Sequence, residues 1–343
     1  MATIYIASDV DLAGKTSLAV TLGRRFEQKG KKVALFKPFY RQGSRYQEDY
    51  DRQIFLDAVR FSQGAQSQWP IELNPEQALS DDNLSGAVAA FGEVSNGMDV
   101  TIVEGVSGID GNVGEASLKT AEKFDASTVV VIGYRPDMGV EEAVMAKSLF
   151  GDRLVGVVLN GITKYKMNSV KTNLVENIKA QGIRVLATIP EDRRLLGVNV
   201  GQLASHLGGE FLSWEDKSDN LVEHLLVGGM VLDSGIHYFE RFSNKAVIVR
   251  GDRPDLQFAA LQTPTSCIVL TGGHMPIQYI FHESRETEIP LIKIEQDTLS
   301  AADALSSIQE YSKFDHPLKQ DKFLSLLEEF GDWASLEALV GSV

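Results

Sequence analysis

The tripeptide Gly14-Lys15-Thr16 directly follows the first apolar segment of the chain, residues 3–7, and leads into a helical stretch. Between a strand and a helix, backbone N–H groups and the helix N-terminus attract phosphate oxygens. A lysine there reaches the terminal phosphates, and a hydroxyl ligates Mg²⁺. The residues from Ser8 to Thr16, called the phosphate loop below, therefore predict a site for a nucleotide with Mg²⁺.

The phosphate loop departs from the usual glycine pattern at one position. That pattern has a glycine five residues before Gly14, and this chain has Asp9 there. The arrangement of strand, loop and helix still favours phosphate binding over a chance tripeptide. We expect nucleotide contacts from the loop and the first helical turn: Asp11, Ala13, Gly14, Lys15, Thr16 and Ser17.

A carboxylate and a lysine stand at the ends of two other predicted strands. Glu104 ends the apolar run 100–104, and a carboxylate there can hold Mg²⁺ opposite the Thr16 hydroxyl. The alternative is an acid that meets solvent or caps a helix. Lys37 follows the run 32–36 and could compensate phosphate or carboxylate charge, although alone it would be an ordinary surface lysine.

Six short segments, rich in Val, Ile and Leu, alternate with amphipathic stretches in the first part of the chain. They are residues 3–7, 32–36, 100–104, 128–132, 154–159 and 185–189. Nearly continuous apolar runs of this length are typical of buried parallel strands, with helices as crossovers. The pattern predicts an α/β fold with a doubly wound parallel sheet, whose ligand lies at the carboxyl ends of the strands.

A polar stretch, residues 213–220, suits a linker to a smaller α/β series. Beyond it we expect a helix near Leu221–Leu226, then three strands (246–249, 267–270 and 291–294) and helices near 254–261 and 301–311. Residues 316–339 have the apolar spacing of a helical tail. The expected domains are therefore residues 1–213, 214–312 and 313–343.

Composition limits the partners of the chain. The net charge of −14 argues against wholesale nucleic-acid binding, because phosphates would be repelled. No apolar run approaches the roughly 20 residues that span a bilayer, and no basic leader precedes the first strand, so we expect a cytoplasmic protein without membrane contact. The single cysteine, Cys267, lies in an apolar strand and is expected to be inert, and the six histidines lack metal-ligand spacing.

The order of the motifs matches a known family. The matching segments are Gly14-Lys15-Thr16, Phe36-Lys37-Pro38, Tyr50-Asp51-Arg52, Val103-Glu104-Gly105, Val158-Leu159-Asn160 and Ile189-Pro190-Glu191-Asp192-Arg193. The chain resembles dethiobiotin synthetase, the ATPase domains of cobyrinic acid a,c-diamide synthase, and the N-terminal half of long bacterial phosphate acetyltransferases. The resemblance implies a P-loop domain that binds ATP or GTP, and a homodimer or higher oligomer.

The resemblance also implies roles for particular residues. Thr16, Asp51 and Glu104 would hold Mg²⁺, and the catalytic pair Lys15 and Lys37 would contact phosphates or a reacting carboxylate. Asn160 and Pro190 would contact the nucleotide, with Asn160 at the purine edge. An amide can donate to and accept from a purine, although Asn160 followed by glycine also reads as a turn.

The second part of the chain resembles the DRTGG domain. The five residues that give this domain its name stand at the ends of two predicted strands: Asp252, Arg253, Thr271, Gly272 and Gly273. An Asp-Arg pair, a hydroxyl and glycines at strand ends could form a small pocket for an anionic metabolite or an interface. The alternative is a pair of turn glycines, with Asp252 capping the next helix.

Three functions follow as hypotheses. The first is a nucleotide-binding regulatory protein whose second domain senses an unknown metabolite or mediates assembly. The second is an ATP-dependent ligase of the dethiobiotin synthetase type, disfavoured because Phe39-Tyr40-Arg41 after Lys37 differ from the small, open sequence of the synthetases. The third is an interaction scaffold that does not bind nucleotide. Transacetylation is not expected, because a phosphate acetyltransferase needs a further catalytic domain.

Overall fold

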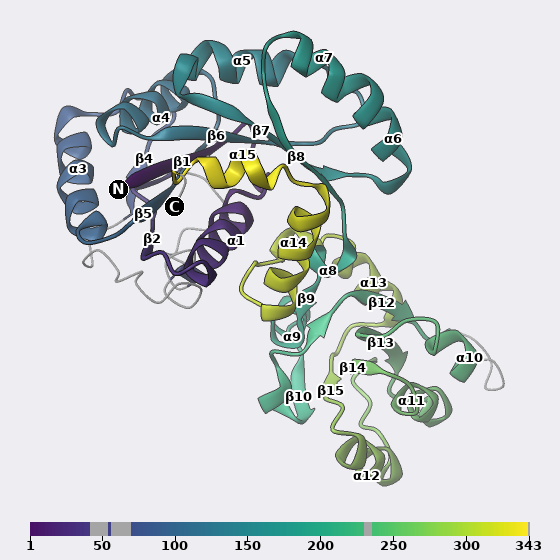
Figure 1. Cartoon of the computed structure of the whole chain (residues 1–343). Helices are drawn as coiled ribbons and strands as arrows, with labels where there is room; N and C mark the ends of the chain where they lie inside the picture. Colours follow the sequence, from purple (N-terminus) through teal and green to yellow (C-terminus); the bar gives the residue numbers. More distant parts are fainter. Residues whose placement is uncertain (42–53, 56–69, 230–234, 342–343) are drawn as a thin grey trace. The chain divides into compact units, whose positions relative to one another are not determined.

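The computed structural model describes residues 1–41, 54–55, 70–229 and 235–341 and divides the chain into two compact units (Figure 1). The first unit consists of Met1–Glu191 together with Gln320–Val343, and the second of Asp192–Lys319. Each unit has its own parallel-dominant sheet. The two α/β bodies can therefore be described separately.

The first unit contains a six-stranded parallel sheet in the order β2-β5-β1-β6-β7-β8. Its strands are β1 (Ala2–Ser8), β2 (Val33–Phe36), β5 (Val100–Ser107), β6 (Ser127–Gly133), β7 (Leu154–Ile162) and β8 (Val185–Pro190). A separate parallel pair is formed by β3 (Phe39–Arg41) and β4 (Ile71–Leu73). The six predicted strands and the parallel α/β fold are confirmed.

Helices cover both faces of this sheet (Figure 1). They are α1 (Lys15–Gln28), α3 (Asp81–Ser95), α4 (Gly111–Lys123), α5 (Glu141–Phe150), α6 (Met167–Ser169), α7 (Val175–Ala180), α14 (Pro317–Phe330) and α15 (Trp333–Ala338). In Figure 1, α3, α4, α5 and α7 lie on one face, whereas α1 and α15 lie on the other. The sheet is therefore doubly wound, as its buried apolar strands predict.

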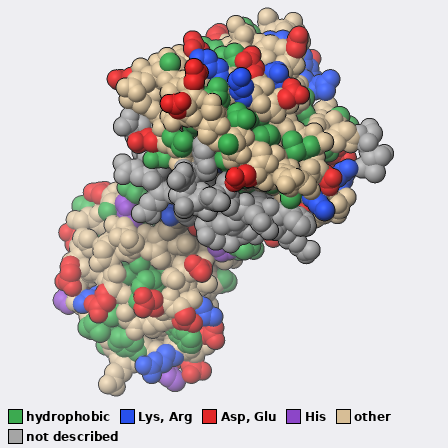
Figure 2. Space-filling model, turned by 90° about the vertical axis from the view of Figure 1, so that its left-hand side faces the viewer, with side chains coloured by type: hydrophobic (Ala, Val, Ile, Leu, Met, Phe, Trp, Pro, Cys, Tyr) green, Lys and Arg blue, Asp and Glu red, His purple; other side chains and the backbone are tan. Residues whose placement is uncertain are grey.

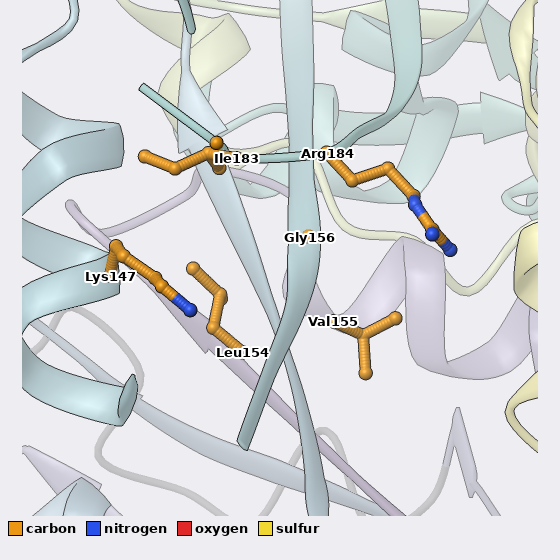
Figure 3. A pocket seen from close by; sticks show the side chains of 7 residues that line it. Lys147, Leu154, Val155, Gly156, Ile183 and Arg184 are labelled. Atoms are coloured by element: carbon orange, nitrogen blue, oxygen red, sulfur yellow. The ribbon is translucent and has the colours of Figure 1, made fainter. Parts of the chain in front are cut away.

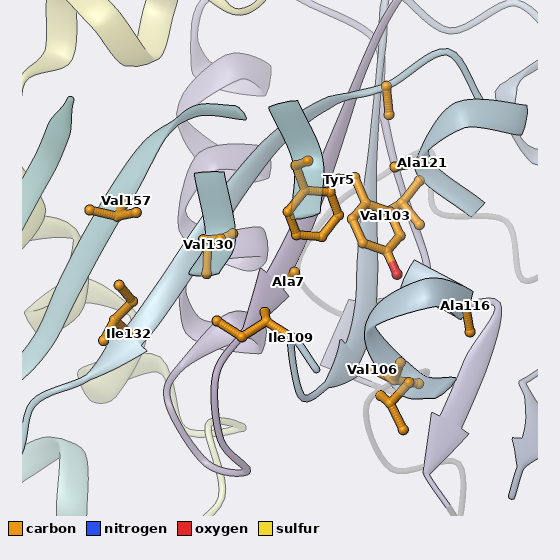
Figure 4. Packing of buried hydrophobic residues seen from close by; sticks show 14 of the residues in the cluster. Tyr5, Ala7, Val103, Val106, Ile109, Ala116, Ala121, Val130, Ile132 and Val157 are labelled. Carbon is orange, nitrogen blue, oxygen red and sulfur yellow. The ribbon is translucent and has the colours of Figure 1, made fainter. Parts of the chain in front are cut away.

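The core between the sheet and α4 explains why a glycine follows Glu104 in β5 (Figure 4). Tyr5 on β1 and Val103 on β5 point toward Ala116 and Ala121 of α4, and all four side chains are buried. A Cβ atom at Gly105 would lie 2.4 Å from the Tyr5 hydroxyl. Glycine after Glu104 therefore makes room for Tyr5, which is a packing role rather than a chemical one.

The second unit has a five-stranded sheet in the order β10-β15-β14-β13-β12, in which only the β10–β15 pair is antiparallel. Its strands are β10 (Glu210–Ser213), β12 (His224–Val227), β13 (Lys245–Arg250), β14 (Thr265–Thr271) and β15 (Leu291–Lys293), with β9 (Val198–Asn199) and β11 (Leu221–Val222) forming a separate pair. Its helices are α8 (Arg193–Leu196), α9 (Val200–Leu207), α10 (Gly235–Phe239), α11 (Pro254–Leu261), α12 (Gln278–Thr287) and α13 (Thr298–Leu305).

Side-chain caps start several of these helices where the chain leaves a strand or loop. Ser80 accepts a hydrogen bond from the Asn83 N–H at the start of α3. Asn199 and Gln202 form a reciprocal capping box on α9, and Asp297 accepts from the Ser300 N–H on α13. Such caps satisfy amide donors that lack partners within the helix and contribute about 1 kcal/mol each.

The compact units have different bounds from the expected domains 1–213, 214–312 and 313–343. β10 lies before the polar stretch, yet it pairs with β15 and so belongs to the second sheet. The C-terminal segment returns to the first unit, where the Asp332 N–H donates to the Leu186 carbonyl at 2.7 Å. Strand pairing over long sequence distances, which composition does not reveal, sets these bounds.

The helix expected near Leu221–Leu226 is wrong. Leu221–Val222 forms β11, and His224–Val227 forms β12, which lies parallel to β13. Apolar residues at 221, 222, 225 and 226 have the spacing of a helix face. Pairing with strands far away in the sequence decides the outcome.

A buried lysine begins β13 of the second unit. Lys245 has no exposed surface, and its Nζ donates to the Pro264 carbonyl at 2.7 Å. Burial lowers the pKa of Lys245 to about 8. The charged form is therefore less stable in the folded protein than in the unfolded chain.

We expect Lys245→Met to flatten the pH dependence of stability. From pH 8 up to the unfolded lysine pKa near 10.4, only the unfolded chain keeps this proton, so the unfolding free energy of the wild type rises with pH. Below pH 8, the unfolding free energy of the Met variant exceeds that of the wild type by up to about 3 kcal/mol, because the variant has no buried charge at this position. Urea unfolding at neutral and alkaline pH checks this. An unfolding free energy that rises with pH as steeply in the variant as in the wild type would contradict it.

Candidate functional site

The phosphate loop connects β1 to α1 at the carboxyl edge of the first sheet. Gly14, its last residue before the helix, has a φ of +103°, a value that side-chain-bearing residues rarely adopt. A Cβ atom at Gly14 would also lie 2.4 Å from the Asn160 Nδ2. Backbone conformation and close approach therefore both require glycine here, and the first-turn N–H groups of α1 face the end of the loop.

Lys15 lies in the mouth of the phosphate loop. Its side chain is 8% exposed, and its Nζ donates to the Ser8 Oγ at 3.0 Å and to the Ser107 Oγ at 2.5 Å. The Ser8 hydroxyl in turn donates to the Val10 carbonyl at 2.8 Å. Two hydroxyls from β1 and β5 thus hold the ammonium group at the edge where strands of an α/β sheet bind ligands.

Lys37 and Glu104 form an ion pair at the neighbouring strand ends. The Lys37 Nζ lies 3.1 Å from the Glu104 Oε1, and the two side chains are 16% and 3% exposed. β2 and β5 are adjacent and parallel, with Phe36 opposite Val103, so both residues reach the same edge. The structure therefore brings together the predicted lysine and the predicted carboxylate.

Asn160, near the end of β7, contacts the phosphate loop directly. Its Nδ2 donates to the Ala13 carbonyl at 2.7 Å. This contact supports the loop from the side of β7, a role that sequence reasoning did not foresee. Pro190 ends β8 at the same edge, and the following Glu191 N–H donates to the Ile162 carbonyl at 2.8 Å.

The remaining predicted residues of the site are placed as follows. Thr16 and Ser17 lie in the first turn of α1, and Asp11 is exposed in the phosphate loop. Asp51, the third predicted magnesium ligand, lies outside the described residues. The Thr16 hydroxyl and the Glu104 carboxylate offer the hard oxygen ligands that Mg²⁺ prefers. In the described part of the chain, no group of three or more His, Cys, Asp or Glu residues could hold a metal ion.

Two residues of the site were missed in the sequence. Ser107 lies beyond the predicted strand 100–104, but β5 extends through it, and its hydroxyl reaches Lys15. Arg135 follows β6, and its Nη1 donates to the Asp9 Oδ2 at 2.8 Å. Hydrogen bonding to Asp9 raises the pKa of Arg135 above its usual value. The position of both residues at strand carboxyl ends was the available signal.

The DRTGG residues lie at the carboxyl ends of β13 and β14 in the second unit. Asp252 accepts from the Arg250 Nε at 2.9 Å, and the Arg253 Nε donates to the Asp255 Oδ1 at 2.9 Å. Each arginine is therefore paired with an aspartate two residues later. Both pairs lie at the loop that begins α11.

The other three DRTGG residues bind neighbouring segments of the same unit. The Thr271 hydroxyl lies 2.7 Å from the Thr298 hydroxyl at the start of α13. The Gly272 N–H donates to the Gln296 carbonyl at 2.8 Å, and the Gly273 N–H donates to Ile294 at 2.9 Å. These contacts give the motif a structural role, and its role as a ligand pocket or interface stays a prediction.

We expect Gly251→Ala to destabilise the second unit. A Cβ atom at Gly251 would lie 2.3 Å from the His274 carbonyl oxygen, and backbone atoms cannot move aside as a flexible side chain can. The expected loss is about 2 kcal/mol of unfolding free energy, as for overpacked sites. Gly229→Ala, where no atom of the described residues lies within 4 Å of a Cβ atom, is the matched control. Thermal unfolding measures both, and equal melting temperatures would contradict the packing role.

A hollow of about 330 Å³ lies at the opposite, amino edge of the first sheet (Figure 3). It is lined by Lys147, Leu154, Val155, Gly156, Gly182, Ile183 and Arg184. In Figure 3 the cationic groups of Lys147 and Arg184 lie on opposite sides of the strand that carries Gly156. They contact the Gly151 carbonyl and the Ser335 hydroxyl, respectively. Converging polar groups, the mark of a ligand site, are therefore not found among these lining residues.

Charged side chains of both signs are interspersed on the face shown in Figure 2. Such a mixed distribution is typical of a solvated surface. None of the described helices is long and apolar enough to cross a membrane. Cys267 is fully buried in β14, and burial raises its pKa to about 12, which keeps the thiol protonated and unreactive.

A doubly wound parallel sheet, a loop ending in Gly-Lys-Thr and a helix that begins at that lysine define the class of P-loop nucleotide-binding domains. The family model of the CobQ/CobB/MinD/ParA nucleotide binding domain matches residues 4–198, and the chain belongs to this family. Residues 202–308 match the DRTGG domain. The combination expected from the motifs is confirmed.

Curated relatives match different lengths of the chain. The phosphate acetyltransferase of Haemophilus influenzae is 26% identical over 336 residues, which cover 86% of this chain and 46% of that protein. The phosphate acetyltransferase of Synechocystis sp. is 22% identical over 302 residues, covering 80% and 42%. The ATP-dependent dethiobiotin synthetase BioD of Bacillus velezensis is 25% identical over 186 residues, covering 50% and 79%. The chain thus spans about half the length of the phosphate acetyltransferases that it matches.

Proposed function

We propose that the chain binds ATP or GTP with Mg²⁺ at the phosphate loop and acts as a regulatory, metabolite-sensing protein. The observation that carries the proposal is the placement of Lys15, whose ammonium group lies between hydroxyls at the ends of β1 and β5. Polyphosphate oxygens can replace hydroxyl acceptors there. The ammonium group binds an anionic phosphate oxygen more strongly than a neutral hydroxyl, because both partners of the bond then carry charge.

A magnesium ion fits the oxygen donors at this edge. Thr16 and Glu104 would hold it together with nucleotide phosphates and water, since Mg²⁺ keeps several waters and takes few protein ligands. When bound, the ion neutralises charge on the phosphates. Lys37, already paired with Glu104, would keep that carboxylate oriented.

The region after Lys37 supports regulation over ligation of a small substrate. Phe39 is 2% exposed, and the strand β3 that contains it pairs with β4. Bulky residues in a small paired sheet occupy the chain directly after Lys37, where the synthetases have a small, open sequence. Ligation of a small carboxylate or carbamate remains the second candidate, supported by the similarity to dethiobiotin synthetase.

The second unit supplies the sensing or assembly function in this proposal. The DRTGG loops place Arg250 and Arg253 beside helix α11, each with an aspartate partner. An anionic metabolite would compete with those aspartates for the guanidinium groups. Homodimerisation through either unit belongs to the same proposal and rests on the resemblance.

Calorimetric titration with Mg-ATP and Mg-GTP, combined with a phosphate-release assay, tests this function. We expect saturable binding of one nucleotide per chain with slow or no phosphate release. Rapid release that depends on an added small carboxylate or amine with bicarbonate would favour the ligase. Absence of binding at millimolar nucleotide would overturn the proposal, and the interaction scaffold would then be the remaining hypothesis.

A further inference from the structure

Asp9 stands where the usual phosphate-loop pattern has a glycine, and its side chain bonds to the end of β6 and to Arg135, which follows that strand. The carboxylate is 4% exposed. Its Oδ1 accepts from the Gly133 N–H at 2.9 Å, and its Oδ2 accepts from the Arg135 Nη1 at 2.8 Å. The Asp9 N–H donates to the Val131 carbonyl at 3.3 Å. Backbone and side chain of Asp9 therefore both attach the start of the loop to β6.

Backbone conformation does not require glycine at this position. The non-glycine residues with positive φ in the described part of the chain include Leu12 of the phosphate loop, at 59°, but not Asp9. An L-residue at position 9 therefore carries no left-handed strain. What the aspartate adds is the pair of bonds to Gly133 of β6 and to Arg135 after it, which a glycine side chain cannot make.

Arg135 connects this attachment to the next helix. Its guanidinium group also donates to the Gly133 carbonyl at 3.2 Å and pairs with Glu142 in the first turn of α5. The arginine is 43% exposed, whereas the Asp9 carboxylate is almost fully buried. Without the arginine, a buried negative charge would lie at the base of a loop that must accept phosphates, which disfavours both folding and anion binding.

We propose that Asp9 is a positioning residue that fixes the start of the phosphate loop to β6, with Arg135 as its counterion, in place of the glycine of the usual pattern. This inference rests on the proposed nucleotide binding and names how that site is held. Asn160 supports the end of the loop from β7, and Ser107 holds Lys15 from β5. Asp9 supplies the corresponding support at the beginning of the loop.

Asp9→Gly is the decisive variant, because it restores the usual glycine pattern and removes the bonds to β6. Loss of a charge-assisted pair that orders the loop is expected to weaken Mg-ATP binding about tenfold. Asp9→Asn, which can still accept from the Gly133 N–H, should recover part of that loss. Affinity equal to or higher than that of the wild type in Asp9→Gly would overturn the inference.

Asp125→Gly is the matched control. It makes the same substitution and also breaks one Asp–Arg pair of the first unit, with Arg153 at 3.1 Å, but it lies before the amino end of β6. Its Mg-ATP affinity should equal that of the wild type. An equal loss in Asp125→Gly and Asp9→Gly would show a general effect of lost pairs and would overturn the specific role of Asp9.

Hydrogen–deuterium exchange without nucleotide separates this inference from the proposed function. Backbone amides of residues 8–16 should exchange about tenfold faster in Asp9→Gly than in the wild type or Asp125→Gly, because local opening costs less. Unchanged exchange overturns the positioning role whether or not the protein binds nucleotide. Failure of the wild type to bind Mg-ATP, with faster loop exchange in Asp9→Gly, would overturn the proposed function alone.

Discussion

Lys15→Ala is expected to weaken Mg-nucleotide binding by about 100-fold or more, because charge-assisted bonds from the ammonium to the phosphates are lost. The lysine is buried in the loop mouth between the Ser8 and Ser107 hydroxyls. Calorimetry or equilibrium dialysis with Mg-ATP and Mg-GTP measures the effect. We expect the variant to fold, because water can bind the Ser8 and Ser107 hydroxyls in place of the ammonium group. Circular dichroism checks this.

Lys179→Ala provides the control for charge alone. Lys179 is an exposed lysine of the first unit that pairs with Glu176 within α7. Its removal changes the net charge as Lys15→Ala does, and should leave the nucleotide affinity unchanged. Equal affinity of the wild type and Lys15→Ala would place nucleotide binding, if any, away from the phosphate loop.

Gly14→Ala has the second large expected effect, a loss of nucleotide binding together with lower stability. The methyl group meets the Asn160 Nδ2 at 2.4 Å, and the φ of +103° strains any L-residue. The strain costs about 1 kcal/mol, and the displacement of Asn160 from Ala13 adds a lost hydrogen bond of similar size. Nucleotide titration and thermal unfolding measure both consequences.

Gly161→Ala separates strain from close contact. Gly161 has a φ of +79°, and no atom lies within 4 Å of a Cβ atom built there, so only the strain remains. We expect Gly161→Ala to lower stability by about 1 kcal/mol and to retain nucleotide binding. If Gly14→Ala binds nucleotide as tightly as Gly161→Ala does, the close approach of Asn160 to the loop is not functional.

The strands of the first sheet could be predicted because their residues are almost all apolar, which is typical of strands buried on both faces of a sheet. Residues 128–132 are almost continuously apolar, and β6 is buried along these positions. The segment 221–226 has apolar residues at 221, 222, 225 and 226, a helical spacing, but it forms strands because β9 and β13 pair with it. A short apolar run contains no information on a partner that lies far away in the sequence.

The candidate site was predictable where local chemistry specifies it. Gly14, Lys15 and Thr16 combine three functions in consecutive residues, and their place between the first predicted strand and a helix indicates phosphate binding. Ser107 and Arg135 are ordinary residue types whose contacts depend on the order of the strands in the sheet. Contacts that arise from sheet order cannot be read from sequence spacing.

Asp9 shows the same limit in a sharper form. In the sequence it departs from the glycine pattern, whereas in the structure its carboxylate accepts bonds from Gly133 at the end of β6 and from Arg135 just after that strand. The bond partners lie more than a hundred residues later in the chain. Asp9 can make these contacts because β1 and β6 are neighbours in the sheet, and the sequence alone does not show that they are.

Electron density of crystals grown with Mg-ATP tests the central claim most directly. The account predicts a polyphosphate in the phosphate loop, with its oxygens bound by first-turn N–H groups of α1 and by the Lys15 Nζ, which leaves the Ser107 hydroxyl. It also predicts a metal ion beside the Thr16 hydroxyl. Density for the nucleotide at another place in the first unit, or an empty loop at saturating Mg-ATP, would contradict it.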